Sequence, residues 1–377
     1  MIEMDEGRVH KHHMLSEIYE NPAAVRSTID SCLSADGAVV LPDARLDPAL
    51  LRCLKQINIL ASGTSRHAGI AGKLMLQELA GVHVDVDFAS EFAHASPEPV
   101  SHELTILITQ SGETADTLNS LRVAASQGSA TLAICNVAGA TLARSAGAVI
   151  YTHAGPEIAI ASTKAFTAQL AALFLLAVHL GQIRGHLSPD AARKHIDELR
   201  SLPAKLEHVL HCDSACGQIA EKNFIASDFL FLGRGVHFPI ALDGALKLKE
   251  TSYIHAEGYP AGEIKHGPYA LIDPVTPIVF LAAVDPGDAG SLVRYRMTLQ
   301  NMRDVRERQG RVIAVAVEGD SEVAALAHDV LYVPPAPELL LPLLEIVPLQ
   351  LLAYHVALRR GLDVDNPRNL VKSVTVE

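Results

Sequence analysis

The sequence predicts an α/β fold made of two doubly wound subdomains, each a parallel sheet flanked by helices in three α/β/α layers. Short apolar segments with strand character alternate with amphipathic helical segments along most of the chain. The same order of elements then recurs at an offset of about 170 to 180 residues, which is too long for a solenoid repeat and fits two copies of one domain. With 49% hydrophobic residues among 377, the chain can bury a substantial core.

Each copy is expected to contain four strands, each followed by a loop and a helix. The strands of the first copy are predicted at 57–61, 104–109, 130–135 and 149–152, and the helix after the first strand should end near Gly81, which can take the C′ position. The strands of the second copy are predicted at 229–232, 277–282, 311–317 and 330–333.

Between the copies, Ser188 is a good N-cap and Pro189 suits the first helical position, so connecting helices are expected there. The predicted organisation is a helical N-terminal segment (1–45), subdomain 1 (46–187), connecting helices (188–226), subdomain 2 (227–362) and a C-terminal tail (363–377).

Charge and composition narrow the class of protein. The formal net charge of -12 argues against nucleic acid or an anionic membrane as the main partner. Five scattered cysteines do not suggest a disulfide framework, and they lack the spacing of a zinc site. The apolar stretch 168–180 is short for a membrane span and is expected to be a buried helix, and the N-terminus lacks a signal-peptide pattern. We therefore expect a cytoplasmic protein with no metal or other cofactor.

Hydroxyl-rich segments follow three of the predicted strands. The run 109–114, with sequence TQSGET, connects a strand to a helix, and Ser65 and Ser162 lie in two other strand-to-helix loops. Because ligands of doubly wound sheets bind beyond the carboxyl ends of the strands, these loops are expected at a ligand site. Hydroxyls and main-chain N–H groups at the positive end of a helix suit a phosphate. Ordinary helix capping is the alternative for each loop taken alone.

The candidate chemical groups lie later in the chain. Lys247 and Glu250 are three residues apart and should share a helix face, where an exposed ion pair is the alternative. His266 lies in a loop bounded by glycine and proline, and Lys372 lies near the chain end; both positions are often merely solvent-exposed.

A carboxylate, an imidazole and a lysine amine are the groups that an enzyme needs to move a carbonyl between C1 and C2 of a sugar. A carboxylate can carry the proton between carbons, and an imidazole can open the ring. A lysine can form a Schiff base or stabilise charge.

Several runs resemble the sugar isomerase (SIS) half of glucosamine-6-phosphate synthase and SIS-type glucosamine-6-phosphate deaminases. The resemblance extends from about residue 12 to the end of the chain. The runs include GTS at 63–65, QSGETADT at 110–117, ASTKAFT at 161–167, ALKLKE at 245–250, GEIKHGP at 262–268, PRNL at 367–370 and KSVTVE at 372–377.

The resemblance implies roles for particular residues. It implies that Glu250 transfers the proton with Lys247 beside it, that His266 opens the ring in the neighbouring subunit of a homodimer, and that Lys372 is the Schiff-base lysine under a closing tail. It places the sugar phosphate against Gly63, Thr64, Ser65, Thr109, Gln110, Ser111, Thr114, Ile160, Ala161, Ser162 and Val371. Two of these residues depart from the family: Thr109 replaces a common serine but keeps the hydroxyl, and Val371 replaces a common alanine and could alter the fit.

Three hypotheses of function follow. The sequence has no room for a glutaminase domain before residue 12. Without a tethered source of ammonia, mass action favours the release of ammonia over its incorporation. We therefore expect a deaminase that converts glucosamine 6-phosphate to fructose 6-phosphate and ammonia. The first alternative is the isomerase domain of a glutamine–fructose-6-phosphate aminotransferase. The second is a non-catalytic sugar-phosphate sensor. The acidic charge of the chain and the lack of an apparent helix-turn-helix segment argue against this alternative.

Overall fold

The computed structural model describes residues 2–3, 9–95 and 101–375, so parts of the predicted N-terminal segment and the last two residues of the predicted tail lie outside this description. The chain divides into two compact units, and each is discontinuous in sequence. The N-terminal unit comprises Ala23–Glu157, Lys164–Pro203 and Val371–Glu377, and the C-terminal unit comprises Met1–Pro22, Ile158–Thr163 and Ala204–Leu370.

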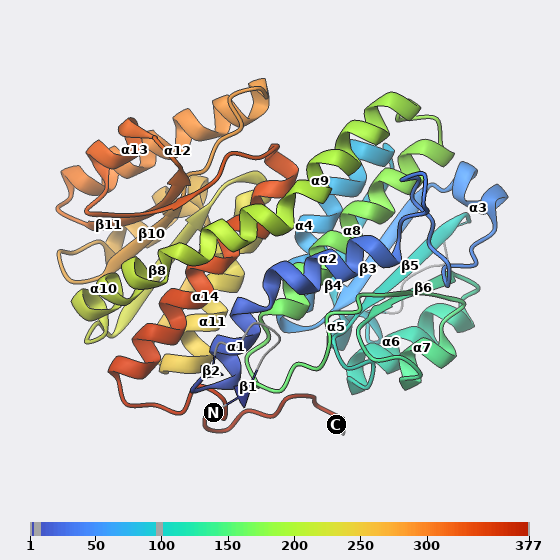
Figure 1. The fold of residues 1–377 in the computed structure, drawn as a ribbon, viewed down its shortest axis with the longest axis horizontal. Helices are drawn as coiled ribbons and strands as arrows, with labels where there is room; N and C mark the ends of the chain where they lie inside the picture. Colours follow the sequence, from blue (N-terminus) through green and yellow to red (C-terminus); the bar gives the residue numbers. More distant parts are fainter. Residues whose placement is uncertain (1, 4–8, 96–100, 376–377) are drawn as a thin grey trace. The chain divides into compact units, whose positions relative to one another are not determined.

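The N-terminal unit is built on a five-stranded parallel sheet (Figure 1). Its strand order is β4-β3-β5-β6-β7. The strands are β3 (Gln56–Ala61), β4 (His83–Phe88), β5 (Glu103–Ile108), β6 (Ala130–Cys135) and β7 (Ala148–Tyr151). All six residues of β5 are buried, as expected of a central strand that is covered on both faces.

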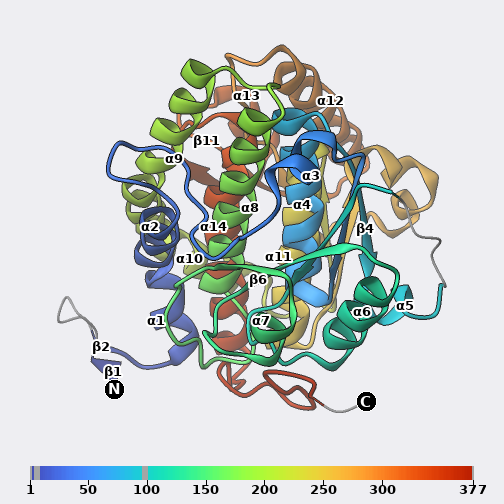
Figure 2. The same ribbon diagram turned by 90° about the vertical axis from the view of Figure 1, so that its right-hand side faces the viewer.

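Helices cover both faces of this sheet. Helices α4 (Gly63–Ala80) and α8 (Lys164–Ile183) lie side by side (Figure 2). Their close approach depends on Gly72, where a Cβ would lie 2.8 Å from a methyl group of Leu173. Helices α6 (Ala115–Ser126) and α7 (Thr141–Ser145) pack on the side that presents Leu107 and Cys135. The remaining helices in this part of the chain are α2 (Asn21–Ser31), α3 (Pro48–Cys53) and α5 (Ala89–Phe92).

The C-terminal unit repeats the arrangement with strand order β12-β11-β10-β8-β9, all parallel. Its strands are β8 (Asp228–Gly233), β9 (His255–Pro260), β10 (Pro277–Leu281), β11 (Arg311–Val317) and β12 (Asp329–Val333). Helix α12 (Ala289–Glu307) and helix α13 (Ser321–Leu326) pack on one face. On the other face, α11 (Phe238–Ser252) meets α14 (Leu341–Arg359), where Gly244 lies against Leu349 and Phe231.

Other elements lead into or connect these layers. The short strands β1 (Ile2–Glu3) and β2 (Val9–His10) pair antiparallel, and α1 (His13–Tyr19) follows them. The connecting helices are α9 (Pro189–Val209) and α10 (Asp213–Asn223). The hydroxyl of Ser188 accepts the N–H of Ala191, which confirms the predicted cap.

Both sheets have the same order when their strands are numbered along the chain, 2-1-3-4-5, so the predicted fold class is confirmed. One expectation was wrong: each sheet has five strands instead of four, because β4 and β9 follow the first strand of each copy. Both additional strands lie at a sheet edge, and the polar residues of β4 and the Gly258 of β9 depart from the apolar pattern of buried strands.

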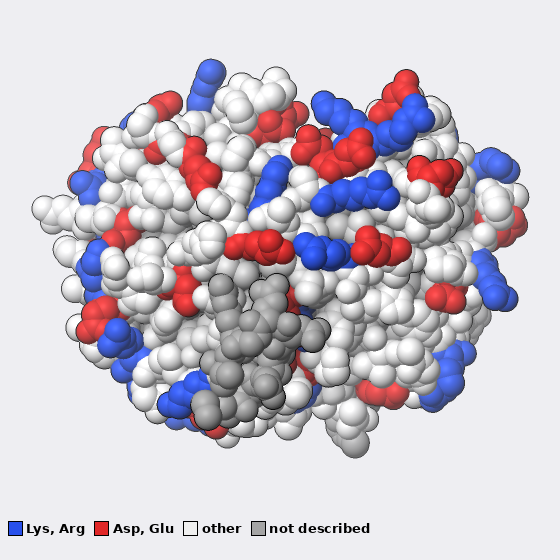
Figure 3. Space-filling view, in the orientation of Figure 1, with Lys and Arg blue, Asp and Glu red and all other residues white. Residues whose placement is uncertain are grey.

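Helix α14, with the turn that precedes it, and helix α8 are long and apolar enough to cross a membrane, but most of each is buried inside the protein, as in the core helices of globular folds. On the face shown in Figure 3, lysine and arginine side chains are interspersed with acidic ones.

Candidate active site

The two neighbouring loops at the switch point of the first sheet carry most of the predicted phosphate ligands. In a sheet of order 2-1-3-4-5, ligands bind where the chain leaves the first and third strands in opposite directions, here β3 and β5. After β5, the hydroxyl of Thr109 lies 2.9 Å from that of Thr114, the residue before α6. The hydroxyl of Ser111 accepts the N–H of Glu113. We call residues 109–114 the hydroxyl loop.

The hydroxyl loop is fixed to its neighbours on both sides. Glu113 accepts the N–H of Thr141 at 2.7 Å, and this contact at the first turn of α7 lowers the pKa of the Glu113 carboxyl. Gly112 has a φ of 71°, and a Cβ there would lie 2.4 Å from the Cβ of Ala140. Only glycine combines this conformation with this close approach. The loop is therefore held in one conformation before any ligand binds.

The residues predicted in the loop after β3 form the first turn of α4. This turn contains Gly63, Thr64 and Ser65, and the hydroxyl of Ser65 accepts a hydrogen bond from the amide of Gln169 on α8 at 3.0 Å. The buried amide of Gln169 thus orients a hydroxyl group at the carboxyl end of β3.

The C-terminal tail contacts the hydroxyl loop. Ser373 lies 3.2 Å from Ser111 between their hydroxyl oxygens, and the carbonyl of Val374 accepts the N–H of Ala115 at the start of α6. Lys372 donates to the carboxylate of Glu157 at 2.7 Å. Lys372 is therefore adjacent in sequence to Ser373, the residue that contacts the hydroxyl loop. Val371, on the other side of Lys372, is largely exposed.

Three other predicted substrate residues belong to the C-terminal unit. Ile160, Ala161 and Ser162 lie in the segment Ile158–Thr163, where the N–H of Ile160 donates to the carbonyl of Asp365. The side chain of Glu17 accepts the N–H groups of Ile158 and Ala159. These contacts fix the backbone of the segment.

The predicted carboxylate and its lysine partner lie together on α11 of the C-terminal unit. Lys247 donates to Glu250 at 2.6 Å. The side chain of Lys247 is fully buried, and that of Glu250 is 22% exposed. The alternative of an exposed surface ion pair is therefore wrong, because the lysine lies in the core. The buried ammonium of Lys247 therefore holds a partly accessible carboxylate in a fixed orientation.

His266 lies in the same unit but on another element, at the end of the 3₁₀ helix Ala261–His266. It is exposed, and within the described residues its imidazole has neither a hydrogen-bond nor an ion-pair partner. The sharp turn that follows is made by Gly267, with a φ of 138°. The imidazole of His266 is therefore exposed on the surface of the C-terminal unit.

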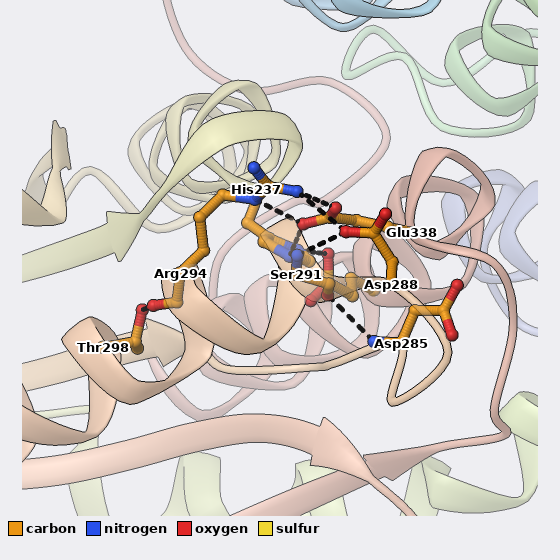
Figure 4. Close-up of polar contacts among 8 residues, drawn as sticks. His237, Asp285, Asp288, Ser291, Arg294, Thr298 and Glu338 are labelled. Atoms are coloured by element: carbon orange, nitrogen blue, oxygen red, sulfur yellow. Dashed lines mark hydrogen bonds and ion pairs between the residues drawn. The ribbon is translucent and has the colours of Figure 1, made fainter.

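The switch point of the second sheet has a different chemistry (Figure 4). There, His237 after β8 and Arg294 after β10 meet carboxylates from the segment that follows β12, and the charges compensate one another. His237 contacts Glu345 at 2.8 Å, and Arg294 donates to Glu338 at 2.7 Å. Burial alone would lower the pKa of His237, but Glu345 and Glu338 together raise it to about 9. We call His237, Arg294, Glu338 and Glu345 the ionic cluster. Since carboxylates already occupy its cationic groups, the hydroxyl loop of the first sheet is the better anion site.

Sequence reasoning missed Glu157. It follows Gly155 and Pro156 in a loop, where neither helical nor strand periodicity indicates a role for it. The structure also finds no group of three or more His, Cys, Asp or Glu side chains suited to a metal ion among the described residues.

A family model described as SIS domain matches residues 50–179 and 226–360, one match on each sheet unit. The chain belongs to the SIS-domain family.

Within that family, the chain is similar to the C-terminal domain of glucosamine-fructose-6-phosphate aminotransferase from Francisella tularensis. The two are 39% identical with a TM-score of 0.90, over 95% of this chain and 99% of that domain. The chain is also 49% identical to the glutamine–fructose-6-phosphate aminotransferase (isomerizing) of Thermus thermophilus, over 97% of this chain. It spans 59% of that relative's length. A glucosamine-6-phosphate deaminase from Thermotoga maritima is 19% identical over 96% of this chain and 99% of that chain, with a TM-score of 0.72, and shows the fold alone.

Proposed function

We propose that the chain is an amino-sugar phosphate isomerase that interconverts fructose 6-phosphate and glucosamine 6-phosphate. The observation that carries the proposal is the preformed hydroxyl loop at the switch point of the first sheet, with Lys372 anchored beside it. The names of relatives at 39% and 49% identity support the same substrate.

In this proposal the first sheet binds the phosphate. Ser65, Thr109, Gln110, Ser111 and Thr114 donate hydrogen bonds to the phosphate oxygens, and the N-terminus of α6 adds its positive end. Gly63 and Thr64 line the same turn, while Ile160, Ala161, Ser162 and Val371 contact the sugar. Binding at the phosphate end holds the reacting carbons in place, and this converts binding energy into rate.

The chemistry is assigned to four side chains. Glu250 takes a proton from one of the carbons C1 and C2 and returns it to the other, and the ammonium of Lys247 orients that carboxylate. His266 opens the sugar ring by moving a proton between the ring oxygen and the anomeric hydroxyl. Lys372 acts at the carbonyl carbon, as a Schiff-base amine or as an ammonium that stabilises the developing oxyanion.

The same isomerisation can run in either of two directions, deamination or synthesis of glucosamine 6-phosphate. As a deaminase, the chain converts glucosamine 6-phosphate and water to fructose 6-phosphate and ammonia. As the isomerase domain of an aminotransferase, it makes glucosamine 6-phosphate from fructose 6-phosphate when ammonia is supplied. The aminotransferase names of the more similar relatives favour the second direction, because the deaminase-named structure supports the fold alone.

The test measures both directions with the purified chain. Ammonia release from glucosamine 6-phosphate is followed by a coupled dehydrogenase assay, and the reverse reaction is run with ammonium chloride and fructose 6-phosphate. Glu250→Gln should bind sugar phosphate but abolish turnover in both directions. Tight binding with no turnover by the wild-type chain would support the sensor hypothesis and refute an enzyme.

The proposed enzyme is a cytoplasmic homodimer in which His266 serves the neighbouring subunit's site. Mixed dimers of His266→Ala and Glu250→Gln chains should then regain up to about a quarter of the activity, because one of the two sites is intact in half of the dimers that form at random. No recovery in verified mixed dimers would contradict sharing of the histidine.

A further inference from the structure

A buried carboxylate outside the predicted site residues holds the end of the chain. The side chain of Glu157 has no exposed surface, and its Oε2 accepts the ammonium of Lys372 at 2.7 Å. Its other oxygen, Oε1, accepts the N–H of Ala165 at 3.0 Å, in the first turn of α8. One carboxylate therefore links a 20-residue core helix to the C-terminal tail.

This carboxylate has the partners that a buried charge requires. An ionised carboxylate is costly to bury unless it is paired and hydrogen-bonded. The N-terminus of α8 supplies main-chain N–H groups and the positive end of the helix dipole, and Lys372 supplies a full positive charge.

Apolar burial contributes little to holding this part of the tail. Val371 is 65% exposed and Val374 is 54% exposed, so the residues on either side of the contact leave most of their surface in solvent. The tail is fixed instead by polar contacts: the Lys372–Glu157 pair, the contact of Ser373 with the hydroxyl loop and one main-chain hydrogen bond from Ala115 to Val374. Of these, the ion pair alone involves full charges, one of them fully buried.

The contacts also set the register of the tail. Lys372 and Ser373 are adjacent, and one binds Glu157 while the other lies 3.2 Å from Ser111. A shift of the tail by one residue would remove both contacts at once. The position of the ammonium relative to the hydroxyl loop is therefore determined by Glu157.

We propose that Glu157 is a positioning residue that fixes the amine of Lys372, in register, beside the hydroxyl loop. The catalytic consequence rests on the function proposed above, whereas the anchoring of the tail does not. Glu157 acts through Lys372 and does not itself contact the substrate.

The central experiment is a double-mutant cycle with Glu157→Gln, Lys372→Met and the double variant. The amide that Glu157→Gln introduces keeps an acceptor for the N–H of Ala165 but carries no charge to pair with an ammonium. Each single variant should lower kcat about a hundredfold with KM changed by less than about threefold, because misplacement of a reacting group affects chemistry more than phosphate binding. The double variant should be no slower than Lys372→Met, because a residue that acts through another has nothing left to position.

Losses that multiply in the double variant would refute the proposal, since they would mean that Glu157 acts independently of the lysine. Asp85→Asn serves as the matched control, because it removes a carboxylate that faces a lysine, Lys73, at an exposed position on β4 and should leave kcat unchanged. Thermal melting of each variant shows whether it is folded.

A second readout does not depend on activity. Carboxypeptidase digestion followed by mass spectrometry measures how fast the tail is trimmed past Lys372. Glu157→Gln and Lys372→Met should each be trimmed about tenfold faster than wild type, because the open tail is the form that is cleaved. Equal rates would overturn the anchoring. A wild-type chain without isomerase activity but with the predicted trimming difference would refute the proposed function and leave the anchoring intact.

Discussion

The ionic cluster of the second sheet makes the stability of the protein depend on pH in a direction that the structure specifies. His237 is 3% exposed, and Glu345 is fully buried. The pKa of His237 is raised from 6.5 to about 9 in the folded chain. A group whose folded pKa is raised contributes stability that is fully present below its unfolded pKa and is lost as the pH rises through the folded pKa.

The size of the effect follows from the shift. Each pKa unit corresponds to about 1.4 kcal/mol, so the histidine contributes about 3 kcal/mol at pH 6 that disappears between pH 6.5 and pH 9. Glu338 behaves in the opposite sense. Burial would raise its pKa, but His237 and Arg294 lower it from 4.5 to about 2. Its contribution is present above pH 4.5 and is lost as the pH falls toward 2.

The assay is urea unfolding at pH 6, 7.5 and 9 for the wild-type chain and for the double variant His237→Gln/Glu345→Gln. The double variant removes the buried charge pair as a unit and avoids leaving Glu345 unpaired. The wild-type free energy of unfolding should fall by about 3 kcal/mol more than that of the variant between pH 6 and pH 9. Parallel pH profiles for the two proteins would refute the charged state that we assign to His237.

Three further predictions concern the candidate site. Gly112→Ala should cost at least about 2 kcal/mol in urea unfolding because its Cβ would meet Ala140, whereas Gly128→Ala, with a positive φ but open space, should cost about 1 kcal/mol. Thr109→Val should weaken fructose 6-phosphate binding about tenfold or more in calorimetry, and Thr109→Ser should restore it; equal affinities would remove this hydroxyl from the phosphate site. Lys247→Met should lower the unfolding free energy by about 3 kcal/mol, and an unchanged melting temperature would contradict its role in a buried pair.

Sequence patterns predicted the central strands well because those strands are buried on both faces and therefore almost continuously apolar. Strands β6 and β11 have the predicted ends. The edge strands β4 and β9 escaped because an edge strand is partly solvated and its sequence need not be apolar. In β4, for example, Asp85 and Asp87 alternate with valines.

The site was predictable where chemistry lies in a local run and unpredictable where it depends on tertiary contacts. The hydroxyl loop is contiguous, so its composition and its predicted place after a strand were sufficient to single it out as a candidate, and the structure confirms that it follows β5. The spacing of Lys247 and Glu250 predicted a shared face but not the burial of the lysine, since burial depends on how α11 packs. The partnership of Glu157 with Lys372 joins residues 215 positions apart, and no local pattern indicates it.

The discontinuous composition of the N-terminal unit has a consequence for protein synthesis. Its first sheet is synthesised before most of the C-terminal unit, whereas the segment Val371–Glu377 follows all of that unit. At a typical rate of about 5 to 20 residues per second, roughly 10 to 45 s separate the end of the first sheet from this segment. During that interval the carboxylate of Glu157 has no lysine partner from the tail. A chain synthesised only as far as Leu370 therefore has the hydroxyl loop without its amine, so this unit is assembled fully only after the C-terminal unit has been made.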